Sequence, residues 1–414
     1  MTACVLSIGT EITRGEIVNS NAAWLAEELT RLGLDVTEAV SIPDDRVLVI
    51  ETLRRVAERH ELVVCTGGLG PTTDDITTEC VAEVLGVPLE RNEASFEAIR
   101  ARMTRFGRTM AASNTKQADF PKGARVLANP NGTAPGFSVR LGRSAMYFMP
   151  GVPLEMKPMF ETFVAPDATA SVKLGIHQIR FRTFGLPEST VNDRLAGIEE
   201  AHGVTIGYRA RFPEIEVKVL ARAPTPVEAE RVARAAANDV QARLADVIFA
   251  EGDPSFARVL GDLCRERSLS LGTAESCTGG LVAELLTEEP GSSQFFRGAI
   301  VAYADAVKKA RLGVDAALLA EKGAVSAEVA RSMAEGARDA LDVDIALAIT
   351  GIAGPSGGTP TKPVGLVHYA VATKDGTTDR KLMSPTSRSY VRLLSAYAGM
   401  RLVRDVILRG HDAA

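Results

Sequence analysis

Residues 63–75 read Val-Val-Cys-Thr-Gly-Gly-Leu-Gly-Pro-Thr-Thr-Asp-Asp, a strand end followed by a glycine-rich turn and polar residues that can begin a helix. The three glycines allow a tight turn and bring backbone N–H groups close to a ligand, which predicts an anion site. Asp74 and Asp75 would repel a bare phosphate but suit one that arrives with a divalent cation. Thr72, Thr73 or Asp74 is expected to cap the helix. The spacing equally allows a capped turn with solvated acids.

The bulk composition limits the kinds of partner. With 414 residues, 46% of them hydrophobic, the chain predicts two or three domains. A net charge of −5 without a basic cluster predicts no direct binding to nucleic acid. The start, residues 1–9, reads as a strand, and no apolar run is long enough to cross a membrane. We therefore expect a cytoplasmic protein with no membrane partner.

Cysteine and histidine usage points to no metal or disulfide framework. The five cysteines lie far apart without a CxxC pair, and four of them lie in apolar or strand-like stretches that suit buried thiols in a reducing compartment. The five histidines are scattered, so the sequence indicates neither a zinc site nor a histidine-based triad.

Strand and helix patterns alternate along the first part of the chain, which predicts an open α/β sheet. The turns after Gly9 and Gly67 follow strand ends, where open sheets bind ligands, so we expect them to line one crevice. Ser20 or Asn21 is expected to cap the helix between them. The next part of the chain mixes strands and helices without a glycine loop, which indicates a small α+β module. We expect it to act as a spacer or dimer surface, and its strand-helix pattern also allows a binding role.

A second strand-to-helix turn lies in the last part of the chain, where a strand expected at residues 268–272 leads to Ser276. A serine at such a turn is exposed beside helix N–H groups that can stabilise an oxyanion. It needs a base, and Lys308 is a candidate because no histidine is near. A lysine acts as a base only when burial or nearby cations favour its neutral form. The alternative is a serine N-cap and a solvated lysine.

Four stretches together resemble the bacterial CinA family, the competence/damage-inducible proteins, and the resemblance covers essentially the whole chain. They are Gly9-Thr10-Glu11, residues 67–75, residues 151–156 and residues 274–280. The resemblance implies an α/β protein with a molybdopterin-binding-like open sheet, a small α+β KH-like middle domain and a C-terminal α/β deamidase domain. We expect these domains at residues 1–168, 169–252 and 253–414.

The family resemblance also implies a bifunctional hydrolase that recycles pyridine nucleotides. The C-terminal domain would deamidate nicotinamide mononucleotide to nicotinate mononucleotide and ammonia, without a metal or cofactor. The N-terminal domain would hydrolyse ADP-ribose to AMP and ribose 5-phosphate with a divalent metal, Mg²⁺ or a similar ion. A cytoplasmic homodimer is expected. The alternative is a non-catalytic factor in competence or DNA damage that binds a pterin or a nucleotide.

For the deamidase domain, the resemblance marks Ser276 and Lys308 as a catalytic dyad, with Tyr303 and Ser293 beside them. Ser293 is the next candidate nucleophile. The expected substrate-binding residues are Gly279, Gly280, Thr350, Gly351, Arg388 and Arg392, with Arg388 preferred over Arg392 for the phosphate. The backbone N–H groups near Gly279 or Gly351 would hold the oxyanion. Two positions depart from the usual family pattern: Ala304-Asp305-Ala306 stands where Ser-Asn-Glu is more common, and Ser387 stands where an aspartate is usual.

For the N-terminal domain, the resemblance supports a metal and a diphosphate at the glycine-rich turn. The expected metal ligands are Asp74, Asp75 and Glu11. The expected substrate-binding residues are Gly67, Gly68, Gly70, Thr72, Lys116, Asn131 and Glu155.

Overall fold

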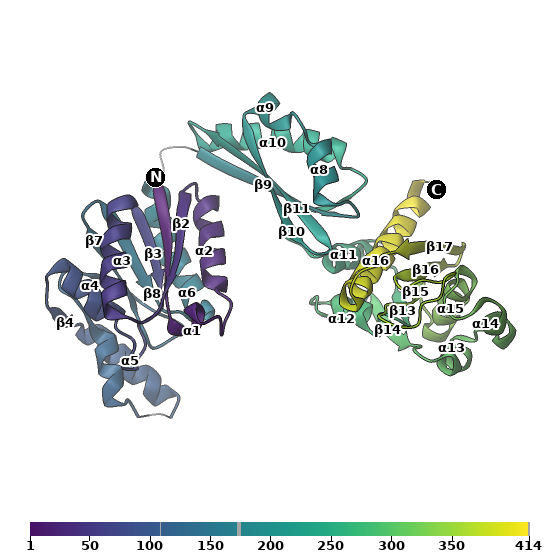
Figure 1. Cartoon of the computed structure of the whole chain (residues 1–414), viewed down its shortest axis with the longest axis horizontal. Helices are drawn as coiled ribbons and strands as arrows, with labels where there is room; N and C mark the ends of the chain where they lie inside the picture. The colour runs from purple at the N-terminus through teal and green to yellow at the C-terminus, as the bar shows by residue number, and fades with distance from the viewer. Residues whose placement is uncertain (108, 172–174, 413–414) are drawn as a thin grey trace. The chain divides into compact units, whose positions relative to one another are not determined.

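The computed structural model describes residues 1–107, 109–171 and 175–412. They form two compact units, shown in Figure 1. Unit 1 comprises Met1–Gln178 and Ala221–Arg231, and unit 2 comprises Ile179–Leu220 and Val232–Ala414. Among the residues described, no helix is long and apolar enough to cross a membrane.

Unit 1 contains a six-stranded sheet in the order β2-β1-β3-β8-β7-β6. Its strands are β1 (Thr2–Ile8), β2 (Asp35–Ile42), β3 (Leu62–Thr66), β6 (Arg125–Leu127), β7 (Gly136–Leu141) and β8 (Ser144–Met149). The pairs β2-β1, β1-β3 and β3-β8 are parallel, and β7 runs antiparallel to β8. Strands β4 (Leu89–Arg91) and β5 (Asp119–Pro121) form a separate ribbon. Because β1 and β3 are almost wholly buried, helices must cover both faces of the sheet.

Two sets of helices cover the two faces of this sheet (Figure 1). The helices are α1 (Thr10–Thr13), α2 (Ser20–Arg31), α3 (Arg46–Arg59), α4 (Thr77–Leu85), α5 (Glu93–Arg105), η1 (Ala112–Ala118), α6 (Pro153–Met159), η2 (Phe160–Val164) and α7 (Ala165–Ser171). Leu53 of α3 and Val81 of α4 pack with one core cluster, and Leu29 of α2 and Met156 of α6 pack with the other.

Two of the predicted helix caps were wrong. Helix α2 is capped by Asn19, whose side chain accepts a hydrogen bond from the Ala22 N–H at 3.0 Å, rather than by Ser20 or Asn21. Helix α4 starts at Thr77 without a side-chain cap. The residues expected to cap α4 are in a turn of their own, in which the Thr72 N–H donates to the Asp75 carboxylate at 2.9 Å.

A four-stranded sheet follows, in the order β10-β11-β9-β12. Its strands are β9 (Gly175–Phe184), β10 (Val204–Arg211), β11 (Glu214–Ala223) and β12 (Ile248–Glu251), with helices α8 (Glu188–Arg194), α9 (Ile198–His202) and α10 (Pro226–Arg243). The α+β character predicted for this part of the chain is confirmed.

The last part of unit 2 is a five-stranded sheet in the order β14-β13-β15-β16-β17. Its strands are β13 (Leu271–Glu275), β14 (Phe296–Val301), β15 (Ile345–Gly351), β16 (Leu366–Thr373) and β17 (Gly376–Met383). The first three are parallel and the last two antiparallel. Strand β13 starts three residues later than predicted, because Ser268 takes a left-handed conformation (φ 54°) just after the preceding helix.

Helices pack on both faces of this sheet. They are α11 (Phe256–Glu266), α12 (Leu281–Thr287), η3 (Ser292–Gln294), α13 (Asp305–Leu312), α14 (Ala316–Lys322), α15 (Ala327–Leu341) and α16 (Arg388–Asp412). Successive side chains of β15 alternate between faces: Leu347 packs with the core of α11, α12 and α16, and Ala348 with that of α13 and α15. Phe184 of β9 joins the first of these cores. The predicted α/β fold class is confirmed.

Candidate functional site

Ser276 lies at the carboxyl edge of the five-stranded sheet, directly after β13. Its N–H donates to the Ile349 carbonyl of β15 at 2.9 Å, so the serine leaves the sheet beside Thr350. The Ala302 N–H donates to the Glu275 carbonyl at 2.8 Å, which brings the end of β14 to the same edge. Three strand ends therefore meet where the deamidase site was predicted.

The buried carboxylate of Glu275 holds the turn around Ser276. It accepts hydrogen bonds from the N–H groups of Gly280 at 2.9 Å, Val282 at 3.1 Å and Ala283 at 3.0 Å. These groups lie at the start of α12, where the helix dipole also favours a negative charge. The sequence offered a signal for this role, an acid just before a glycine-led helix, but we assigned Glu275 no function.

The predicted oxyanion donor at Gly279 is engaged in the turn itself. Its N–H donates to the Ser276 carbonyl at 3.1 Å, and the neighbouring Gly280 N–H serves Glu275. Both glycines have positive φ angles, 60° and 96°, so they shape the turn. Burial raises the pKa of Cys277 to about 12, which keeps this neighbouring thiol protonated.

Lys308 is buried on the first turns of α13, with 1% of its surface exposed. Its Nζ donates to the Tyr303 carbonyl at 3.2 Å and lies 3.3 Å from a carboxylate oxygen of Asp305. Among the residues described, no hydrogen bond joins Lys308 Nζ to Ser276 Oγ. The lysine is therefore at the predicted edge of the sheet, with its amine directed to the loop that precedes its own helix, and the dyad stays a prediction.

The two arginines of α16 have different partners. Arg388 donates to the Gly354 carbonyl at 2.8 Å and to the Tyr303 hydroxyl at 2.9 Å, and both Arg388 and Tyr303 are exposed. Arg392 donates twice to the Thr278 carbonyl, at 3.1 and 2.6 Å. Arg392 thus supports the turn that carries Ser276, whereas the exposed guanidinium of Arg388 is better placed to meet an anionic substrate.

Thr350 and Gly351 end β15 at the same edge, and the Thr350 hydroxyl donates to the Ala324 carbonyl at 2.8 Å. His368 is paired with Thr350 across the sheet. Its Nδ1 is buried without a hydrogen-bond partner among the described residues, and burial lowers its pKa. No sequence motif marked this histidine.

Ser293 does not belong to this cluster. It is exposed on η3, immediately before β14, and β14 starts opposite Leu271, the first residue of β13. The two strands are parallel, so Ser293 lies at the amino edge of the sheet and Ser276 at the carboxyl edge. The side chain of the adjacent Gln294 lines a cavity at the amino edge together with Ser270.

The glycine-rich turn of unit 1 also lies at a carboxyl edge. A Cβ on Gly67 (φ 98°) would lie 1.9 Å from the Ile8 carbonyl oxygen, and one on Gly68 (φ 66°) would lie 2.0 Å from Thr77 Oγ1. The Gly67 N–H donates to the Met149 carbonyl at 3.1 Å. The ends of β1, β3 and β8 are therefore adjacent, as the single predicted crevice requires.

Asp74 and Asp75, the two predicted acids of this turn, differ in exposure and in hydrogen-bond partners. The Asp75 carboxylate accepts hydrogen bonds from Thr72. Asp74 is exposed, and hydrogen bonds from Thr72 and its own backbone N–H, with the charge of Lys116, lower its pKa. Lys116 donates to the carbonyls of Thr72 and, at 3.0 Å, Asp75. A hollow of about 130 Å³ is lined by Gly68, Gly70, Asp75 and Lys116 among others.

Glu155 and Asn131 lie at the neighbouring turns. Asn129, which we did not predict, donates to the Glu155 carboxylate at 2.7 Å, whereas the Asn131 side chain donates to the Leu154 carbonyl at 2.8 Å. Asn21 was also missed: it donates to the Gly151 carbonyl at 2.6 Å, and its Oδ1 is buried without a partner among the described residues.

The three predicted metal ligands do not converge in this structure. A carboxylate oxygen of Glu11 lies over Gly9, 2.7 Å from where a Cβ would be. In the part of the chain that the structure describes, Asp74, Asp75 and Glu11 do not form a group whose ligand atoms all lie within 4.8 Å of one another. Asp74 and Glu11 are both exposed, so a cation can reach either carboxylate.

A different cluster, of Cys4, Glu38 and His60, does bring three potential metal ligands within 4.8 Å. Its carboxylate already accepts a hydrogen bond from Arg55 and lies 2.9 Å from His60 Nε2. Burial raises the pKa of Cys4 to about 12. The cluster is thus a partly exposed ion-pair network beside a buried thiol that stays protonated. All five cysteines are buried and free, whereas the sequence predicted burial for four of them.

Three known domain families match the chain in order. They are "Probable molybdopterin binding domain" over residues 4–170, "Damage-inducible protein CinA KH domain" over residues 179–250 and "CinA C-terminal domain" over residues 253–407. The fold and these matches define a protein with a molybdopterin-binding-like sheet, a KH-like middle domain and a C-terminal α/β domain.

Relatives that match over nearly their full length identify the family of the chain. A CinA-like protein of Anaeromyxobacter sp. (strain Fw109-5) is 42% identical over 403 residues, 97% of this chain and 98% of the relative. A CinA-like protein of Geobacter sulfurreducens is 40% identical over 412 residues, 99% of this chain and 100% of the relative. The crystal structure of the protein CinA from Thermoplasma acidophilum is 34% identical, with a TM-score of 0.38, and covers 40% of this chain and 97% of that one. The chain belongs to the CinA family.

Glu275→Gln tests the buried carboxylate. An amide would turn donors toward N–H groups that need acceptors, so we expect the free energy of unfolding of unit 2 to fall by about 2 kcal/mol. Urea unfolding followed by circular dichroism measures it. Glu284→Gln, an exposed acid in the first turn of α12, is the matched control. Equal transition midpoints for the two variants would contradict the structural role of Glu275.

Proposed function

We propose that the C-terminal site is an amidase that converts nicotinamide mononucleotide to nicotinate mononucleotide and ammonia. The observation that carries the proposal is the position of Ser276 at a strand-to-helix turn whose neighbouring loop leads to the buried Lys308. A hydroxyl and an amine at one sheet edge are the parts that serine–lysine acyl transfer needs. The substrate itself comes from the family resemblance.

The reaction would run as two acyl transfers. The neutral amine of Lys308 accepts the Ser276 proton while Oγ attacks the carboxamide carbon of the substrate. Collapse of the tetrahedral intermediate breaks the C–N bond, and the leaving amine takes the proton from Lys308 and departs as ammonia. Water, deprotonated by the same amine, then hydrolyses the nicotinyl ester and returns the proton to Ser276. The balance needs only water.

Arg388 is proposed to bind the phosphate of the mononucleotide. Its guanidinium is exposed and already lies 2.9 Å from the Tyr303 hydroxyl, so both side chains can contact one anionic group. Arg392 is a positioning residue in this scheme because its guanidinium is held by the Thr278 carbonyl.

Ser276→Ala should lower kcat for deamidation of nicotinamide mononucleotide by about 1,000-fold or more, because Ser276 Oγ is the nucleophile of the proposed covalent step. Chromatography of the nicotinate mononucleotide formed measures it. Ser293→Ala, at the opposite edge, is the matched control and should retain the activity. The reverse result, an active Ser276→Ala and an inactive Ser293→Ala, would move the nucleophile to Ser293.

For the N-terminal domain we propose metal-dependent hydrolysis of ADP-ribose to AMP and ribose 5-phosphate. The glycine-rich turn at a carboxyl edge, with the open carboxylate of Asp74 and the fixed amine of Lys116, favours a phosphate-bearing ligand. Oxygen donors suit Mg²⁺, which needs only one or two carboxylates beside substrate phosphates. When bound, the ion would offset the diphosphate charge and activate water. Asp74, and Glu11 or Glu155 after movement, would hold it.

Chelation provides the test. Removal of divalent ions with EDTA should abolish AMP formation from ADP-ribose, and Asp74→Asn should lower it by about 100-fold at saturating Mg²⁺. Chromatography of AMP measures both. Asp35→Asn, an exposed acid at the start of β2, is the control. Undiminished AMP formation in EDTA would exclude the metal role.

The rival proposal is a factor in competence or DNA damage that binds a pterin or a nucleotide without chemistry. The shared fold with molybdopterin-binding domains favours it for the N-terminal domain, since fold does not fix function. Binding of ADP-ribose without products would support it. We further propose a cytoplasmic homodimer that does not contact nucleic acid directly, and a DNA affinity that falls steeply with salt would contradict the last point.

A further inference from the structure

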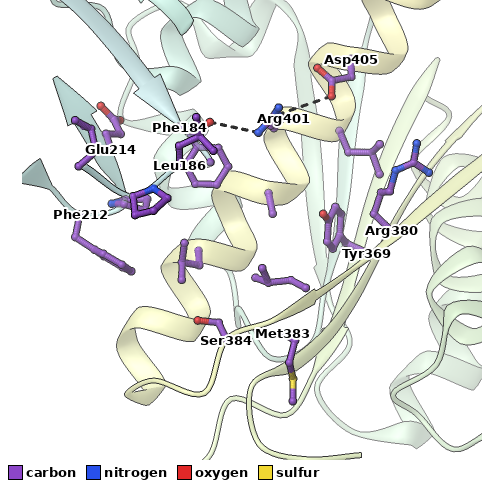
Figure 2. Close-up of a pocket in the computed structure, with 18 of the residues that line it drawn as sticks. Phe184, Leu186, Phe212, Glu214, Tyr369, Arg380, Met383, Ser384, Arg401 and Asp405 are labelled. Atoms are coloured by element: carbon purple, nitrogen blue, oxygen red, sulfur yellow. Dashed lines mark hydrogen bonds and ion pairs between the residues drawn. The ribbon is translucent and has the colours of Figure 1, made fainter. Parts of the chain in front are cut away.

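Unit 2 contains a cavity of about 880 Å³ that is separate from the Ser276 cluster (Figure 2). Its lining comes from the segment between β9 and α8, the β10–β11 turn, strands β16 and β17, and α16. No catalytic or substrate-binding residue assigned above lines it. The volume lies within the range of small-molecule sites in proteins, about 300–1,000 Å³.

The wall and mouth of the cavity are apolar. Leu394, Ala398 and Leu402 lie four residues apart on α16 and form one wall, because that spacing repeats along one face of a helix. Phe212 and Met383 line the cavity too, although their side chains are 42% and 49% exposed. Large apolar side chains beside a hollow mark a binding surface more often than an ordinary part of the protein surface.

Positive charge gathers at one end. Arg380, Arg401 and Arg409 line the cavity with Asp405, which lies 4.0 Å from Arg401. Within the described part of the chain, neither Arg380 nor Arg409 forms an ion pair, and both are exposed. The remaining acid, Glu214, pairs with Arg182, from which it accepts a hydrogen bond of 2.7 Å. Among the residues described, the guanidinium groups of Arg380 and Arg409 are therefore left without an ion-pair partner.

An unused polar group lies away from these arginines. Ser384 is 9% exposed and lines the cavity, and its hydroxyl has no hydrogen-bond partner in the part of the chain described. Figure 2 shows Ser384 and Met383 toward one end of the cavity and Arg401 and Asp405 toward the other. A ligand that satisfies this lining has a flat apolar body, an anionic group at the arginines and a hydrogen-bonding atom near Ser384.

We propose that this cavity is a binding site for a small amphipathic anion, an aromatic or similarly flat apolar molecule with a carboxylate, sulfonate or phosphate group. A single chain encloses it with four separate segments, which suits a compact ligand better than the flat face of a protein partner. The site is independent of the proposed hydrolytic reactions, so it can fail or stand without them.

Two fluorescent probes that differ by one sulfonate group test the proposal on the full chain. They are 8-anilinonaphthalene-1-sulfonate and its neutral analogue N-phenyl-1-naphthylamine. We expect one saturable sulfonate site per chain, with an affinity at low salt about fivefold higher than for the neutral probe. In the double variant Arg380→Gln and Arg409→Gln, this preference should disappear.

Two single variants locate the site. Ala398→Phe fills the cavity from α16, and Met383→Asp adds a repelling charge on an exposed residue at the end of β17. Each should abolish saturable binding of the sulfonate probe while the thermal unfolding midpoint of Met383→Asp stays unchanged. Val227→Asp replaces an exposed apolar residue outside the cavity and should bind as the parent does.

Three results would overturn the proposal. They are no saturable binding to the parent chain, binding that survives both Ala398→Phe and Met383→Asp, and equal affinity for the charged and neutral probes. The last would leave an apolar hollow without anion recognition.

Discussion

The carboxylate of Glu275 is the interaction on which the C-terminal site depends. A buried charge is costly unless it is fully hydrogen-bonded, and here three backbone N–H groups at the start of α12 supply the partners. The same residue accepts the Ala302 N–H through its backbone carbonyl. Glu275 thus fixes the turn that carries Ser276 with its side chain, and the loop that leads to Lys308 with its backbone. One residue thus contacts both the turn that carries Ser276 and the end of β14.

Unit 1 builds its edge by a different means. Its glycine-rich turn is held by backbone contacts so close that a side chain at Gly67 would meet the Ile8 carbonyl. Close backbone packing shapes the glycine-rich turn, but it does not fix the position of any carboxylate side chain. The acids lie on two turns: Asp74 and Asp75 are in the glycine-rich turn, where Asp75 is hydrogen-bonded to Thr72, and Glu155 is hydrogen-bonded to Asn129 at a neighbouring turn. The C-terminal turn, by contrast, is organised around a single buried carboxylate.

The sequence predicted the parts of the fold that depend on local pattern. Alternating strands and helices predicted the open sheets, and glycines after strand ends predicted both turns. Contacts between residues far apart in the chain could not be predicted from the sequence. No residue near Ser276 indicates that the Ser276 turn is held by Arg392, which lies 114 residues after Thr278 and donates to its carbonyl. Ser293 was grouped with Ser276 by resemblance, but parallel strands place the two serines at opposite edges. The hydrogen-bond partner of a particular acid, such as Asn129 for Glu155, also depends on loop geometry that residue types do not encode.

The bond from Arg392 to the Thr278 carbonyl has a consequence for biosynthesis. Ser276 leaves the ribosome long before residue 392 does, and during that interval the carbonyl beside the serine has no guanidinium to bind it. Domains of a growing chain generally fold as units, from the N-terminus onward. The glycine-rich edge of the first domain can therefore mature while translation continues, but the serine turn reaches its final form only after the closing helix has been made. In a nascent chain, the first domain would therefore be folded before the C-terminal domain.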